Sequence, residues 1–219
     1  MRKIVSVVGA GGKTTYLHRL ADAYTLRNYK VLLITTTHMG LEADTDISCD
    51  AETIRRKLRE TGYCMAGKDD GKGKIGPLPP EVLQQAMEEA EMVLVEADGA
   101  KHFWAKYPAA HEPVILPGTT DLVILMGLET IGKKAGEAVF RFEQLHEALG
   151  IEPDETVTLS LLERIIETGY LQRLKGQLDG VRINILFTKI EDEELTYLTK
   201  EEAGKLYAQD GACHLPGRR

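Results

Sequence analysis

The sequence predicts an α/β fold with a mainly parallel sheet and helices on both faces. Short apolar runs alternate along the chain with segments in which apolar residues recur at helical spacing. The first apolar run leads directly into a glycine turn and a helix, within the stretch from Ile4 to Thr15. Most apolar runs end in polar residues, and parallel strands bring such ends to one edge of a sheet, where ligands bind.

A β-α-β unit opens the chain. Its helix is indicated by apolar residues at helical spacing between Leu17 and Tyr24, and its second strand by the apolar run from Val31 to Ile34. Residues 53–60 are expected to form the next helix. Residues 62–80 include a polar stretch rich in glycine and proline, which predicts a loop or hairpin excursion from the domain.

The second half of the chain continues the alternation of strands and helices. Further strands are expected at Met92–Val95, Leu122–Met126 and Val181–Phe187. Further helices are expected over residues 82–90, 141–149, 160–168 and 195–206. The length of 219 residues suits one large domain or two small ones, and we expect a single domain over residues 1–219.

The glycine turn after the first strand has the composition of a phosphate-binding loop. Glycines let backbone N–H groups converge on phosphate oxygens, and the following helix adds its positive end. The common pattern G-x-x-x-x-G-K-[ST] would need glycine where Val7 stands, so this loop is a shortened one, and an ordinary glycine-rich turn is the alternative. The candidate nucleotide-binding residues are Gly9, Ala10, Gly11, Gly12, Lys13, Thr14 and Thr15.

Two acids follow the strand expected at Met92–Val95. Glu96 and Asp98 are two residues apart, so on an extended chain both would point to the same face. Carboxylates are preferred ligands of hard cations, which makes Thr14, Glu96 and Asp98 the candidate Mg²⁺ ligands. Gly99 could bring a backbone N–H to the terminal phosphate. An acidic turn without a ligand is the alternative.

Two further segments could take part in binding or catalysis. The threonines that end the second strand, from Thr35 to Thr37, could meet Mg²⁺ or a second substrate, or they could simply favour a strand. The loop from His102 to Pro117 contains the only tryptophan and the pair His111 and Glu112. Histidine with a neighbouring carboxylate suits acid–base catalysis, and a structural role is the alternative.

The last strand ends in a sequence close to the guanine-reading pattern [NT]-K-x-D. It reads TKIE. In this segment Lys189 would pack along the base, and Glu191 would accept hydrogen bonds from the N–H groups of the base. Because the acid is not aspartate, the sequence leaves ATP and GTP equally open. A solvated strand end is the alternative.

Composition limits the classes of partner. The formal net charge is -7, so we expect neither nucleic acid nor an anionic membrane surface as the main partner. The three cysteines are odd in number and lack metal-ligand spacing, which predicts neither a disulfide framework nor a zinc site. No apolar run is long enough to span a bilayer, and the N-terminus does not indicate a signal peptide, so a cytoplasmic protein is expected.

Several of these segments together resemble the YqeC-type family of P-loop proteins. They are VVGAGGKTT, the strand ending in TTTH, VEADGAK, PAAHEPV and DLVILMGLETIGK. The resemblance extends from Ile4 to Glu191 and implies a three-layer P-loop NTPase-like domain that binds ATP or GTP with Mg²⁺. The family is described as accessory to selenium-dependent molybdenum hydroxylases. The resemblance therefore implies a molybdenum hydroxylase or a cofactor-maturation protein as partner.

Three functions fit these observations. The leading one is a Mg²⁺-dependent NTPase that drives a maturation step, in which Lys13 stabilises phosphate charge and Glu96 orients the attacking water or acceptor. The alternatives are a short-loop kinase or ligase that acts on a small acceptor, and a nucleotide-gated binding module without catalysis. The oligomeric state is open, with a homodimer as one option.

Overall fold

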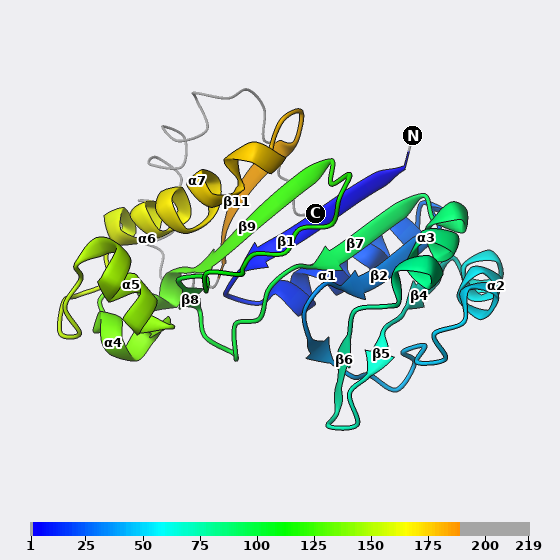
Figure 1. Ribbon diagram of the computed structural model, residues 1–219, viewed down its shortest axis with the longest axis horizontal. Coiled ribbons are helices and arrows are strands. Elements are labelled where there is room, and N and C mark those ends of the chain that lie inside the picture. Colours follow the sequence, from blue (N-terminus) through cyan, green and yellow to red (C-terminus); the bar gives the residue numbers. More distant parts are fainter. Residues whose placement is uncertain (1, 189–219) are drawn as a thin grey trace.

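A six-stranded parallel sheet forms the centre of the molecule (Figure 1). The computed structural model describes residues 2–188. The strand order is β11-β9-β1-β7-β2-β4, and every neighbouring pair is parallel. The strands are β1 (Lys3–Gly9), β2 (Val31–Thr35), β4 (Tyr63–Met65), β7 (Met92–Glu96), β9 (Asp121–Gly127) and β11 (Arg182–Thr188). The α/β prediction is confirmed.

The central strands are apolar runs because both of their faces are covered. All residues of β7 and β9 are buried, and β1 lies between these two strands. The register pairs Val7 with Glu96 and Gly9 with Leu125. The carboxyl ends of β1, β7 and β9 therefore meet at one edge of the sheet.

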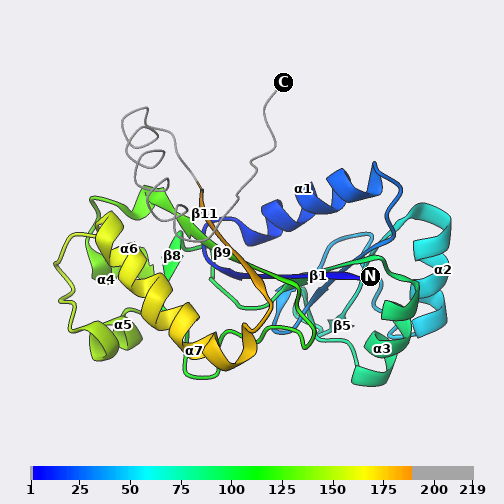
Figure 2. The same cartoon turned by 90° about the horizontal axis from the view of Figure 1, so that it is seen from above.

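Helices cover both faces of this sheet (Figure 2). On one face, α1 (Lys13–Thr25) packs through Leu17 and Ala21 on side chains of β1 that include Val5. On the other face, the core contains Ile4 and Val8, which alternate along β1 with Val5 and Val7 as the period of a strand requires. The helices packed on this second face include α2 (Ala51–Thr61), α3 (Pro80–Glu89) and α6 (Leu159–Ile165).

The excursion between α2 and α3 supplies two strands of a small antiparallel sheet, whose third strand, β3 (Met39–Gly40), comes before α2. The other two strands are β5 (Lys68–Asp69) and β6 (Lys74–Gly76). Residues 63–65 belong instead to the main sheet as the edge strand β4, which the sequence pattern did not indicate. Three residues are too few for a periodicity to be recognised.

A second group of elements lies between β9 and β11. It contains η1 (Leu128–Thr130), α4 (Ala135–Ala138), β10 (Val139–Phe140), α5 (Phe142–Leu149), α6, η2 (Ile166–Leu171), α7 (Gln172–Leu174) and η3 (Lys175–Gln177). Strand β10 pairs in parallel with β8 (Ala105–Lys106), which follows β7. This pairing joins the loop after β7 to the second group.

The segment η2 is a π-helical continuation of α6. A Cβ on Gly169 would lie 2.8 Å from Cδ of Pro108, so glycine permits the close approach of this segment to the loop after β8. Tyr170 is fully buried next to that contact. None of the helices within residues 2–188 has the length and apolar character needed to cross a membrane.

Candidate functional site

The loop between β1 and α1 has a backbone that only glycine adopts readily. Gly9, Gly11 and Gly12 have φ of 94°, 99° and 101°. A Cβ on Gly9 would lie 2.1 Å from the Leu125 carbonyl oxygen, and one on Gly11 would lie 2.7 Å from the Gly127 nitrogen. Gly12 borders open space. Conformation and close packing therefore require the glycines of this loop, which we call the glycine loop (residues 9–12).

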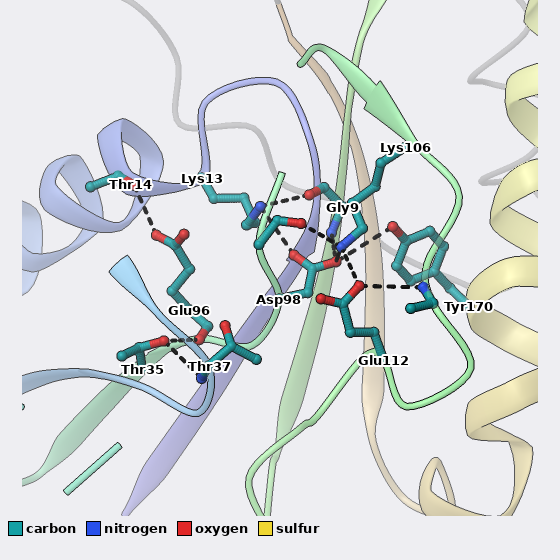
Figure 3. Close-up of polar contacts among 12 residues, drawn as sticks. Gly9, Lys13, Thr14, Thr35, Thr37, Glu96, Asp98, Lys106, Glu112 and Tyr170 are labelled. Carbon is teal, nitrogen blue, oxygen red and sulfur yellow. Dashed lines mark hydrogen bonds and ion pairs between the residues drawn. The ribbon is translucent and has the colours of Figure 1, made fainter. Parts of the chain in front are cut away.

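Lys13 begins α1 and bends back across the glycine loop (Figure 3). Its side chain is 4% exposed. The ammonium group donates to the Gly9 carbonyl at 2.6 Å and pairs with Asp98 Oδ1 at 3.0 Å. A lysine ammonium has three N–H donors, so these two partners leave capacity for a third oxygen.

Thr14 and Glu96 form an oxygen pair beside Lys13 (Figure 3). Thr14 Oγ1 donates to Glu96 Oε2 at 2.8 Å. Burial raises the pKa of Glu96, and the charge of Lys13 and the bond from Thr14 offset part of that rise. A carboxylate next to a hydroxyl is the kind of partial oxygen set that Mg²⁺ completes with phosphate and water.

The threonines at the end of β2 fix the position of Glu96. Thr35 Oγ1 donates to the Glu96 carbonyl oxygen at 2.9 Å, and the Thr36 N–H donates to the same oxygen at 3.1 Å. Thr36 Oγ1 also donates to the Val114 carbonyl at 2.5 Å. Within residues 2–188, the buried Thr37 Oγ1 has no hydrogen-bond partner. The cluster thus joins β2 to β7, and Thr37 leaves one hydroxyl unused at this edge.

Asp98 has different surroundings from Glu96. The expectation that both acids face the same way assumed an extended chain, but β7 ends at Glu96 and Asp98 lies in a bend. Asp98 is fully buried, and its Oδ2 accepts from the Gly9 N–H at 2.9 Å and pairs with Lys106 Nζ at 3.1 Å. The Tyr170 hydroxyl donates to the same oxygen at 3.5 Å. With Lys13 on Oδ1, this carboxylate lies between two lysines.

A buried ion network continues from Asp98 away from the glycine loop. Lys106 is fully buried and donates to the Gly99 carbonyl at 2.6 Å and to Glu112 Oε2 at 2.7 Å. The Arg141 guanidinium bonds to both oxygens of Glu112. Burial raises the pKa of Glu112, but Lys106 and Arg141 outweigh it and leave this pKa below its ordinary value. We call Asp98, Lys106, Glu112 and Arg141 the ion network.

The remaining expected site residues are placed as follows. Thr15 and His111 are exposed, and among residues 2–188 the His111 side chain has no hydrogen bond or ion pair. Lys189 and Glu191, like the helix expected over 195–206, lie outside the described residues. Directly before them, Thr188 Oγ1 donates to the Gly11 carbonyl at 2.6 Å. The end of β11 therefore contacts the glycine loop.

Sequence reasoning did not assign a site role to Lys106, Arg141, Tyr170 or Thr188. Lys106 had one local signal, a lone cation in the mostly uncharged segment from Phe103 to Ala110. Thr188 is the first residue of the TKIE segment, but that pattern gave no sign of its contact with the glycine loop. Arg141 and Tyr170 offer no local signal, because only the fold brings them to the site.

The described residues contain no cluster of three or more histidine, cysteine, aspartate or glutamate side chains that could hold a metal. Mg²⁺ at nucleotide sites is usually bound by one or two carboxylates together with phosphate and water. A hydroxyl and a carboxylate, such as Thr14 and Glu96, fit that demand. Glycines 9, 11 and 12 likewise fit a phosphate, because their backbone allows close approach.

The sheet, the two helical layers and the glycine loop define an α/β protein with a three-layer, P-loop-like arrangement. The family model described as "YqeC protein" matches residues 5–143. A relative from Escherichia coli strain K12, named "Uncharacterized protein YqeC", is 32% identical over an alignment of 171 residues, and the alignment covers 74% of this chain and 67% of the relative. The chain belongs to the YqeC family.

Proposed function

We propose that the chain binds a nucleoside triphosphate with Mg²⁺ at the glycine loop and hydrolyses it to drive a maturation step. The observation that supports this most is the loop itself, whose three glycines at positive φ lead into buried Lys13. Membership of the YqeC family supports a selenium-related accessory role. The finer step, maturation of a selenium-dependent molybdenum hydroxylase, rests on the resemblance described above.

The glycine loop and Lys13 would bind the phosphates. The backbone N–H groups at the start of α1 lie at the positive end of the helix dipole, which favours a negatively charged phosphate. Lys13 would direct its remaining N–H to a phosphate oxygen and neutralise charge there, which is the main contribution a protein makes to phosphoryl transfer. Its buried position makes this charge effective, because little water screens it.

Thr14 and Glu96 would hold the metal. When bound, Mg²⁺ supplies positive charge to the phosphate oxygens. Of the two acids, Glu96 is the better ligand, since within residues 2–188 its carboxylate accepts a hydrogen bond from one hydroxyl, which can rotate away. Glu96 would also accept a hydrogen bond from an attacking water.

Asp98 would act as a positioning residue in this proposal. Its two oxygens hold the Gly9 N–H and the Lys13 ammonium, so it fixes both the start of the loop and the phosphate-binding cation. Lys106 and Glu112 would act through Asp98, because they hold that carboxylate from the other side. A role for His111 in turnover stays a prediction.

A cavity at the carboxyl edge of the sheet, lined by residues that follow β7 and β9, favours a second candidate function, transfer of the phosphoryl group to a small acceptor. This kinase or ligase function would release nucleoside diphosphate only when the acceptor is present. Hydrolysis would release it with water alone. Measuring diphosphate release with and without candidate acceptors separates the two.

The binding proposal is tested by calorimetric titration of Mg·ATP and Mg·GTP. We expect Lys13→Ala and Thr14→Ala each to lower affinity about tenfold or more, since a charge-assisted contact is worth about 1.5–3 kcal/mol. Lys72→Ala, which removes an exposed lysine at the hairpin tip, is the matched control. If Lys13→Ala and Thr14→Ala both bind nucleotide with unchanged affinity, and circular dichroism shows that both are folded, the proposed nucleotide site is wrong.

The maturation step is tested in the host. Deleting the gene should lower the activity and selenium content of a selenium-dependent molybdenum hydroxylase and spare molybdenum enzymes without selenium. Complementation by the wild type, but not by Lys13→Ala, is expected. Full hydroxylase activity in the deletion strain would refute this step and leave the nucleotide site untouched.

A further inference from the structure

A cavity of about 290 Å³ lies at the carboxyl edge of the sheet, outside the groups assigned to the nucleotide. Two segments supply its walls, the turn after β7 and the segment after β9. Its lining includes Lys101, His102, Phe103, Trp104, Thr130 and Lys133. We call it the Trp104 pocket.

The Trp104 pocket and the glycine loop share one neighbour, Gly127 at the end of β9. The Gly127 N–H donates to the Trp104 carbonyl at 2.6 Å, and Thr130 Oγ1 donates to the Gly127 carbonyl at 2.9 Å. On the loop side, a Cβ on Gly11 would lie 2.7 Å from the Gly127 nitrogen. Gly127 therefore lies between the glycine loop and two residues that line the pocket, Trp104 and Thr130.

The charges around the pocket favour an anion. Lys101 and Lys133 are exposed lining residues, opposed by one acid, Glu137. Arg141 also lies near Phe140, with its guanidinium 5.1 Å from the ring centre, but its charge is paired with Glu112 and does not add to this opening. The Lys101 ammonium lies 5.5 Å from the same ring centre. Cations thus outnumber acids at this opening, although the whole chain has a net charge of -7.

The apolar part of the pocket favours a flat group. Phe103 lines it and stacks on Phe140, with ring centres 5.4 Å apart and planes at 28°. Trp104 adds a second large ring to the lining. Aromatic walls beside lysines suit a ligand that has both a flat ring and a negative charge.

The turn that presents these side chains has an uncommon backbone. Lys101 and His102 are consecutive non-glycine residues with φ of 44° and 65°, in the left-handed region. Such conformations cost free energy and tend to occur where function requires a particular side-chain direction. Here they carry the chain from Asp98, in the ion network, to Trp104, in the pocket.

We propose that the Trp104 pocket binds a small molecule that has a phosphate or carboxylate group on a flat ring. Lysines 101 and 133 would contact the anionic group, and the rings of Phe103 and Trp104 would contact the flat part. This ligand is distinct from the nucleotide, and its binding does not depend on the nucleotide assignment.

The chain has one tryptophan, so a spectrum of the ¹⁵N-labelled full chain shows one indole N–H signal, which reports directly on this pocket. Phenyl phosphate, benzoate, inorganic phosphate and phenol would be titrated separately. We expect phenyl phosphate or benzoate to shift the indole signal saturably at about tenfold lower concentration than inorganic phosphate or phenol, because only they combine both features. The tighter of the two identifies the anionic group. If neither shifts the signal saturably, the proposal is wrong.

Variants separate the pocket from the glycine loop. The double variant Lys101→Ala/Lys133→Ala should weaken binding of the tighter probe about tenfold or more. Lys134→Ala, which removes an exposed charge one residue from the lining, should leave it unchanged. Loss of binding in Lys13→Ala but not in the double variant would place the probe at the glycine loop and overturn the proposal. A saturable indole shift in a chain that fails to bind nucleotide would refute the proposed function alone.

Discussion

Glu96 and Asp98 are two buried acids at the end of one strand, yet they have opposite surroundings. The Glu96 carboxylate accepts from one neutral hydroxyl, that of Thr14. The Asp98 carboxylate accepts from a backbone N–H and lies between Lys13 and Lys106. One strand end thus supplies an acid with unused ligand capacity and another whose charge is already neutralised by the protein.

Because of this difference, we expect Glu96 to contribute to metal binding and Asp98 to contribute to the stability of the fold. A buried carboxylate that no cation contacts directly is costly, so Glu96 would gain from a metal, which is the direction its raised pKa also indicates despite the nearby charge of Lys13. Asp98 and its partners instead neutralise one another. We therefore expect changes in the ion network to lower the free energy of unfolding, and a change at Glu96 to alter metal-dependent binding.

The largest expected effect is on stability, at the lysine that serves two carboxylates. Lys106→Met leaves Asp98 and Glu112 each without one buried cation, which should lower the free energy of unfolding by about 3–5 kcal/mol. Urea denaturation followed by circular dichroism measures this loss. Lys72→Met, at an exposed position, should change stability by less than about 0.5 kcal/mol. A loss below about 1 kcal/mol at Lys106 would show that the network is weakly coupled.

The next effect depends on pH and concerns Glu112. Its folded pKa is lowered below the ordinary value of 4.5, so its contribution to stability is present above that value and is lost as the pH falls through the folded pKa. Glu112→Gln should therefore cost about 1.5–3 kcal/mol near pH 7 and much less in acid. Denaturation of both proteins between pH 3 and pH 7 measures the difference. A difference that stays constant over this range contradicts an ionised, paired Glu112.

A smaller effect is expected where β11 contacts the glycine loop. Thr188→Val keeps the shape of the side chain but removes its bond to the Gly11 carbonyl, which should lower stability by about 1 kcal/mol. Nucleotide affinity should fall as well, because the bond holds the loop at Gly11, whereas Asp98 holds it at Gly9. Urea denaturation and calorimetry measure the two effects. A stable variant with normal affinity would show that Asp98 alone fixes the loop.

The parts of the fold that could be predicted are those with long local signals. Strands β1, β7 and β9 are mostly apolar runs of five to seven residues, and the glycine loop and both acids lie at the ends of β1 and β7 or within three residues after them. Strand β4 has only three residues and was not expected. Local patterns thus located the site edge and missed the short elements.

The arrangement within the site could not be predicted, because it depends on contacts between distant segments. Arg141 reaches Glu112 across 29 residues, through the pairing of β8 with β10. Tyr170 reaches Asp98 across 72 residues, through the π-helical segment packed on Pro108. The sequence placed both acids at the sheet edge, but only these contacts distinguish Asp98 from Glu96.

Glu96→Gln should have the smallest effect on stability, since glutamine retains an oxygen that accepts from Thr14 and removes a buried charge. We expect a change within about 0.5 kcal/mol, measured by urea denaturation. Glu60→Gln, on the exposed side of α2, is the matched control.

We propose that Glu96 holds Mg²⁺ at the nucleotide while Asp98 holds Lys13 and the glycine loop. The most direct test is calorimetric titration of ATP and GTP, with and without Mg²⁺, into the wild type and Glu96→Gln. We expect the wild type to bind one of these nucleotides more tightly with Mg²⁺. We expect the variant to lose about tenfold or more of this gain but to bind metal-free nucleotide normally. A variant that retains the full gain from Mg²⁺ would show that Glu96 does not hold the metal.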